Sequence, residues 1–154
     1  MYAFFFTFVR FYRYKIGWIR METRKKIAPL LILCILWTAL ITVCFLLPPS
    51  HFHKLPKWNI NHLDKMVHFG FFFIQSILVS LLFRFRTLKS YFPIVIFSTI
   101  QALLYGGIIE FLQNEFFNRT GDVNDLIADG LGGFFGALAY PLFFSLFRND
   151  KKTK

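Results

Sequence analysis

The sequence predicts an all-α integral membrane protein, a four-helix bundle whose N- and C-termini are both cytoplasmic. The first observation is composition. Of the 154 residues, 56% are hydrophobic, whereas an ordinary soluble domain is about 45–50% apolar with glycine included. The second is a set of four apolar segments that reach or approach the roughly 20 residues needed to cross a bilayer. The third is the one-sided distribution of lysine and arginine between these segments.

The four apolar segments are residues 27–47, 67–83, 92–111 and 126–147, and the second is slightly short. Each ends at charged, polar or proline residues, and Pro48 and Pro49 stop the first. Because no internal repeat or low-complexity linker separates the segments, they predict one membrane domain over residues 27–147. A basic, aromatic segment precedes it at residues 1–26, and a basic cytoplasmic tail follows at residues 148–154.

The positive charges predict the orientation, because lysine and arginine are enriched in short cytoplasmic loops. Fourteen of the 18 lie before the first segment, between the second and third, or after the fourth. The other four are Lys54, Lys57, Lys65 and Arg119. This asymmetry predicts that residues 48–66 and 112–125 face outward, away from the cytoplasm. It also accounts for the net charge of +10, so nucleic-acid binding has no support.

The first twenty residues have two interpretations. They are aromatic and basic, their apolar run is too short to span, and they lack the small-residue cleavage site of a signal peptide. They form an interfacial helix lying on the membrane, or they are untranslated and the protein starts at Met21, which opens the sequence METRKKIAPLL.

Acidic residues concentrate at the predicted outward ends of the segments. Six of the eight lie there, and helical spacing places three of them on one face of the fourth segment together with glycines. Since small residues let membrane helices approach closely, this face should point into the bundle. The three stripes are Asp122, Asp125, Asp129, Gly132, Gly133 and Gly136; Gly106, Glu110 and Gln113; and Asp64, His68 and Gln75.

These stripes predict one polar pocket at the outer ends of the helices. Ionisable residues at such positions in membrane helices are candidates for function. The pocket residues are Asp64, Lys65, His68, Glu110, Gln113, Arg119, Asp122, Asp125 and Asp129, and the helix-packing residues are Gly106, Gly132, Gly133 and Gly136. The alternative is a purely structural network of salt bridges in which Lys65 and Arg119 neutralise part of the acid. Gln75 and Gln101 lie mid-span and predict hydrogen bonds between helices.

The sequence leaves open whether the pocket binds a cofactor. Carboxylates with one imidazole suit a divalent metal ion such as Mn²⁺, Mg²⁺, Ca²⁺ or Zn²⁺. The sequence contains no HExxH or similarly compact signature, and the loop pair His51 and His53 is a weak one. No metal is therefore assigned from sequence.

Three motifs in order, DKMVHF, GGIIEFLQ and NRTGDVNDLIADGLGGFFG, resemble the VanZ-like family of small bacterial membrane proteins over residues 30–147. The family is named for a protein linked to reduced sensitivity to the glycopeptide teicoplanin. The resemblance therefore implies a role in the bacterial cell envelope but no particular reaction. The chain departs from the family at Asp129, where asparagine is usual, and before Arg119, where FFN replaces a frequent Pro-Gly turn.

Three classes of function follow. The first is an enzyme acting on an envelope or lipid-linked substrate, with the acids as general acid or base and Lys65 and Arg119 holding phosphate or carboxylate. The second, a transporter, is weaker because the chain is small and the acids do not continue to the inner side. The third is a protein that binds envelope precursors. Together with these residues, the resemblance implies a bacterial inner-membrane protein that lowers sensitivity to teicoplanin-type glycopeptides by binding or modifying such a substrate, and it leaves open whether the protein is an enzyme.

Overall fold

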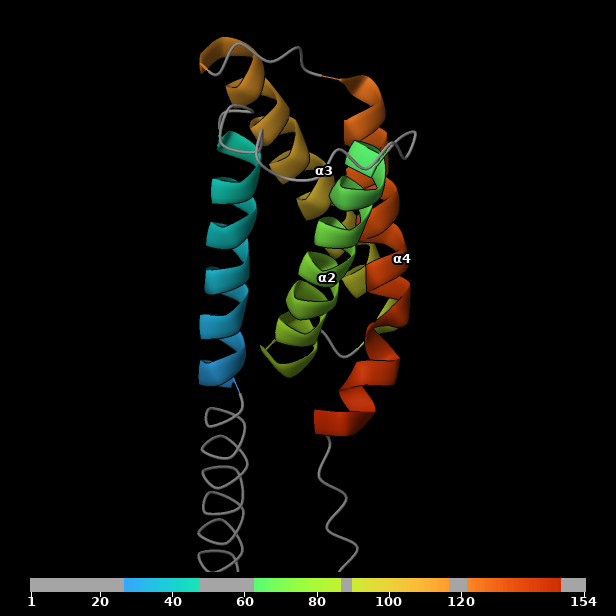
Figure 1. Cartoon of the computed structure of the whole chain (residues 1–154). Helices are drawn as coiled ribbons and strands as arrows, with labels where there is room; N and C mark the ends of the chain where they lie inside the picture. Colours follow the sequence, from blue (N-terminus) through green and yellow to red (C-terminus); the bar gives the residue numbers. More distant parts are fainter. Residues whose placement is uncertain (1–26, 48–62, 87–89, 117–121, 148–154) are drawn as a thin grey trace, which may run out of the picture.

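The computed structural model describes residues 27–47, 63–86, 90–116 and 122–147. They form a first span, Ile27–Leu46, followed by α2, Leu63–Arg86, α3, Tyr91–Phe116, and α4, Val123–Phe147 (Figure 1). All four helices are long and apolar enough to cross a membrane. The prediction of an all-α protein with four spans is confirmed, and the orientation of its termini stays a prediction.

The last three helices extend beyond the apolar segments that predicted them. The helix α2 begins at Leu63, before the apolar run from residue 67, and continues to Arg86. Its first turn carries Asp64, and the first turn of α4 carries Asp125. Acidic side chains stabilise a helix N-terminus because its unpaired N–H groups carry partial positive charge. Apolar length measures the crossing of the bilayer, whereas the helix itself continues through these polar turns.

The four helices alternate in direction, so that four helix ends meet at each end of the bundle. The end of the first span, the start of α2, the end of α3 and the start of α4 lie together at the top of Figure 1. The helix α4 packs most extensively against α2 and then against α3. Two apolar clusters fill the interior, one around Leu81 and Ile94 and one around Ile41 and Phe72.

Glycines set the closeness of α4 to its neighbours. A Cβ atom added at Gly132 or Gly136 would collide with the backbone carbonyl oxygen of Phe69 or Phe73 on α2, and one at Gly133 would collide with Ala102 on α3. Lipid tails are as apolar as the helices, so helix association in a membrane depends on this kind of close packing. The small residues on α4 therefore hold its polar first turns against α2 and α3.

Uncharged polar contacts tie the first span to the rest of the bundle. The Trp37 indole N–H donates to the carbonyl oxygen of Phe71 at 3.1 Å, and the Gln75 amide donates to Thr38 Oγ1 at 3.0 Å. The Tyr105 hydroxyl donates to the carbonyl oxygen of Thr38 at 2.9 Å. The predicted interhelical hydrogen bond of Gln75 is thus present.

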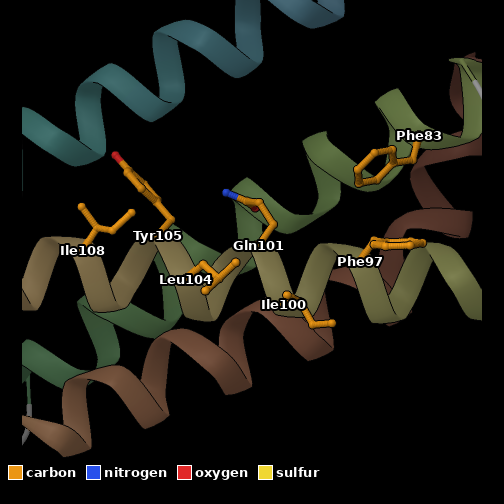
Figure 2. Close-up of a pocket in the computed structure, with 7 residues that line it drawn as sticks. All are labelled: Phe83, Phe97, Ile100, Gln101, Leu104, Tyr105 and Ile108. Carbon is orange, nitrogen blue, oxygen red and sulfur yellow. The ribbon is translucent and has the colours of Figure 1, made fainter.

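The other mid-span amide, Gln101, behaves differently. Its Oε1 atom is buried and has no hydrogen-bond partner among the residues that the structure describes. With Tyr105 it lines an open, mostly apolar groove of about 370 Å³, and Figure 2 shows both side chains pointing toward the first span. The acidic residues of the predicted pocket do not line this groove.

Candidate functional site

The end of the bundle where α2 and α4 begin is called the polar end here, because the acidic residues gather there. Its outermost charged side chains, called the rim, surround Lys65 in the first turn of α2. Its ammonium nitrogen lies 2.8 Å from Asp122 Oδ2, 3.1 Å from Asp125 Oδ1 and 3.2 Å from Asp64 Oδ2. Two of these carboxylates belong to the start of α4, so the lysine fastens α4 to α2. Because three carboxylates already surround its charge, Lys65 is a poor anchor for a phosphate or carboxylate substrate.

Asp122 joins three helices at the start of α4. Its Oδ1 accepts the backbone N–H of Asn124 at 2.8 Å, and its carbonyl oxygen accepts the N–H of Asp125 at 3.0 Å, which is the geometry of a helix N-cap. Its own backbone N–H donates to Glu110 Oε2 on α3 at 2.9 Å. The hydrogen bond from Lys65, followed by that from the Asn124 backbone, lowers the pKa of Asp122 to about 2.

A second group lies beneath this rim: His68 of α2, Glu110 of α3 and Asp129 of α4. All three are buried, and one nitrogen of His68 and one oxygen from each carboxylate lie within 4.8 Å of one another. His68 Nδ1 is 2.9 Å from Asp129 Oδ1. The ring of Phe45, from the first span, stacks on the imidazole with centroids 4.1 Å apart. Each of the four helices therefore contributes to this buried trio or to its wall.

Two carboxylate oxygens of the buried trio make no hydrogen bond to the described residues. Glu110 Oε1 and Asp129 Oδ2 are buried and have no hydrogen-bond partner among the described residues. Asp129 Oδ2 lies over Gly106, where a Cβ would collide with it. A buried polar atom without a partner costs about 1–3 kcal/mol, and more when charged. A ligand that hydrogen-bonds to or coordinates these two atoms would therefore remove the largest free-energy cost at this site.

The polar end carries an excess of negative charge. The described residues there include five carboxylates in contact with one another or with a shared partner, and Lys65 is the single lysine or arginine among them. The other described basic residues, Arg84 and Arg86, lie in the last turn of α2, at the opposite end of the bundle. Electrostatics therefore favours a cation, or a substrate with a cationic group, at this end.

Seven of the nine sequence-predicted pocket residues come together in the structure: Asp64, Lys65, His68, Glu110, Asp122, Asp125 and Asp129. Gln113 is buried nearby on α3, but its amide donates to the carbonyl oxygen of Phe45 at 2.8 Å. This contact satisfies a carbonyl in the last turn of the first span. Arg119 lies outside the described residues.

Sequence reasoning missed the aromatic wall of the site. Phe45 is one of 23 phenylalanines, and nothing in the spacing of the first span marks which of its faces meets His68. The position three residues before Pro48 places its ring at the polar end, which is the one signal that the sequence contains. The contacts of Thr38 and Tyr105 between spans were missed for the same reason.

Comparison with protein families decides the relationship. The sequence model of the VanZ/LLP1 family matches residues 1–144. This chain belongs to the VanZ/LLP1 family. The resemblance carried by the three motifs is confirmed, and the match also takes in the N-terminal segment. No curated protein and no solved structure gives a match. The chain is thus a multi-pass membrane protein of the VanZ/LLP1 family.

Proposed function

We propose that this VanZ/LLP1 protein acts in the bacterial cell envelope, where it binds or modifies an envelope or lipid-linked substrate at the polar end of its bundle. The proposed effect is lower sensitivity to teicoplanin-type glycopeptides. With both termini on the cytoplasmic side of the membrane, this end faces outward, toward envelope precursors. One observation carries the proposal. The acids descend from the rim into the bundle, and the exposed fraction of the side chain falls from 55% at Asp64 to 12% at Asp125 and 0% at Asp129.

This gradient supports a site that a headgroup-level ligand can reach. A substrate would meet the exposed carboxylates first and the buried trio last. The buried carboxylates and the imidazole are the side-chain types that act as general acids and bases. A ligand with a cationic group would be matched by the excess of carboxylates over Lys65.

The described part of the bundle gives less support to transport. Between the polar end and Arg84, the buried polar contacts are made by uncharged side chains, such as Gln75 with Thr38 and Ser80 with Ser98. Charged side chains in membrane helices mark ion and proton pathways, and here the described carboxylates all lie toward the polar end.

The test uses neutral variants that keep shape and remove charge. Glu110→Gln and Asp125→Asn should return cells to the glycopeptide sensitivity of cells without the protein, while its abundance in the membrane is unchanged. Sensitivity is measured with a lipid-tailed glycopeptide. Glu115→Gln is the matched control, because it makes the same change at an exposed position on the same helix. Abundant Glu110→Gln and Asp125→Asn proteins that still protect cells would refute the proposal.

A structural role is the second candidate, and the triple contact of Lys65 favours it. If the cluster serves only to hold the helices, Lys65→Met should lower the abundance of the protein, because three carboxylates lose their cation. Combining Lys65→Met with Asp122→Asn and Asp125→Asn should then restore both abundance and protection. Restored abundance without protection would instead favour the substrate site.

A further inference from the structure

We propose that His68, Glu110 and Asp129 bind one divalent transition-metal ion, Zn²⁺ or Mn²⁺, between α2, α3 and α4. The proposal goes beyond the envelope role and does not depend on it.

The geometry of the trio is close to that of a metal site. Metal–ligand bonds of about 2.0–2.2 Å place neighbouring ligand atoms roughly 3 Å apart. The distance of 2.9 Å between His68 Nδ1 and Asp129 Oδ1 has this value. The third donor, from Glu110, completes a set of three ligand atoms that lie within 4.8 Å of one another. Three helices thus supply one ligand each.

The unpaired oxygens are a second and independent indication. Glu110 Oε1 and Asp129 Oδ2 are buried without a hydrogen-bond partner among the described residues. When ionised, the two side chains carry two negative charges beside a single imidazole, and Lys65 makes its contacts with other carboxylates. An uncompensated buried charge costs several kcal/mol. A divalent ion would neutralise both carboxylates and give their free oxygens a partner.

The donor set selects the kind of ion. Imidazole suits Zn²⁺ and other transition metals, whereas carboxylate suits Mg²⁺, Ca²⁺ and Mn²⁺, so a mixed set of one nitrogen and two oxygens favours Zn²⁺ or Mn²⁺. Mg²⁺ keeps several waters and is rarely held by an all-protein cage.

Neighbouring groups orient the donors. The stacked ring of Phe45 fixes the plane of the imidazole, and the backbone N–H of Asp122 holds Glu110 Oε2. Groups that orient the ligands in this way contribute strongly to metal affinity. Three protein ligands leave a coordination position for water or a substrate atom, as in catalytic zinc sites.

The experiment measures metal in the full chain, purified in detergent without chelators and through an affinity tag that contains no histidine. Mass spectrometry of the wild-type protein should find about one Zn²⁺ or Mn²⁺ per chain. Asp129→Asn and Glu110→Gln should lose at least nine-tenths of it. The exposed-acid variants Asp64→Asn and Glu115→Gln should retain it, as should the double variant His51→Ala with His53→Ala.

A second measurement does not depend on how the variants fold. After treatment with a chelator, the thermal midpoint of the wild-type protein should rise on addition of Zn²⁺ or Mn²⁺ and should not rise with Mg²⁺. Absence of metal together with no such rise would overturn the proposal. Retention of the ion by both Asp129→Asn and Glu110→Gln, or its loss from the His51 and His53 variant, would also overturn it. A chain that binds metal here but gives no protection against glycopeptides would refute only the proposed function.

Discussion

Nδ1 of His68 and Oδ1 of Asp129 lie 2.9 Å apart and join α2 to α4 where the two side chains are 3% and 0% exposed. The two residues are 61 positions apart in the sequence, and their contact is buried beneath the rim of the polar end. The aspartate supplies a charge where the VanZ-like motif usually carries asparagine, so the chain holds one more buried carboxylate than the resemblance implies. The two partners are therefore expected to respond differently to substitution.

Loss of His68 should destabilise the protein more than neutralisation of Asp129. His68→Ala leaves a buried carboxylate without its partner and should lower the free energy of unfolding by about 3–5 kcal/mol. Asp129→Asn keeps a hydrogen-bonding group beside the imidazole and removes the buried charge, so its loss should be smaller. Chemical unfolding in mixed micelles, with chelator present so that metal does not contribute, gives both values. Equal losses would contradict this account of the pair.

Gly106 should be far less tolerant of a methyl group than Gly107, its neighbour on α3. A Cβ at Gly106 collides with the carboxylate of Asp129, whereas one at Gly107 meets only Leu126 Cδ1 at 3.9 Å. Replacing glycine by alanine in a helix gains up to about 1 kcal/mol, and overpacking costs about 1–3 kcal/mol. Gly107→Ala should thus be neutral or stabilising, and Gly106→Ala should be less stable than it by about 1–3 kcal/mol. Thermal unfolding of the two proteins side by side is the measurement, and a more stable Gly106→Ala would show that the carboxylate moves freely.

The contribution of the Asp122 carboxylate should be lost only in strong acid. The hydrogen bonds from Lys65 and then from the Asn124 backbone lower the pKa of Asp122 from 3.8 to about 2. A group whose pKa is lower in the folded state contributes stability that is complete above its unfolded pKa and disappears as pH falls through its folded pKa. The stability difference between the wild type and Asp122→Asn should therefore stay constant from neutral pH to about pH 5 and shrink between about pH 4 and pH 2.

Asp122→Asn is a clean comparison, because asparagine caps a helix as well as aspartate does. The other carboxylates of the polar end are present in both proteins, so their effects largely cancel in the difference. Chemical unfolding at a series of pH values gives the curve. A difference that grows on acidification would mean that the charge of Asp122 opposes folding.

The predicted orientation can be tested with a reporter that fluoresces only in the cytoplasm. Fused after Lys154, it should be bright, because the basic tail stays inside. Fused after Asn118, between α3 and α4, it should be dark. Western blots of both fusions control for expression, and the reverse pattern would place the polar end in the cytoplasm and remove its access to envelope precursors.

Much of the bundle could be predicted from local sequence patterns. Apolar length gave the four spans, and the shared helix face of Asp125, Asp129 and Gly132 indicated that the acids point inward. Gly132 does meet the backbone of α2, with Asp129 one turn earlier in contact with His68. These features depend on the period of one helix, which the sequence displays directly.

Other features depend on how one helix meets another, which periodicity does not encode. The ring of Phe45 over His68, the three carboxylates around Lys65 and the amide of Gln113 on the first span are of this kind. Gln101 shows the same limit, because its mid-span amide predicted an interhelical hydrogen bond that its carbonyl oxygen does not make among the described residues. The helices were also predicted to be too short, because their first turns are polar and therefore fall outside the apolar segments.

The long sequence separation across the polar end has a consequence for synthesis in the cell. Ribosomes add about 5–20 residues per second, so the 61 residues from His68 to Asp129 take about 3–12 s. During this interval α2 has available its hydrogen-bond partners on the first span, Trp37 and Thr38, whereas Lys65 and His68 lack the aspartates of α4. The helix α4 thus leaves the ribosome after the other three and closes the polar end, and in a nascent chain arrested before α4 Lys65 retains one of its three described carboxylate partners, Asp64.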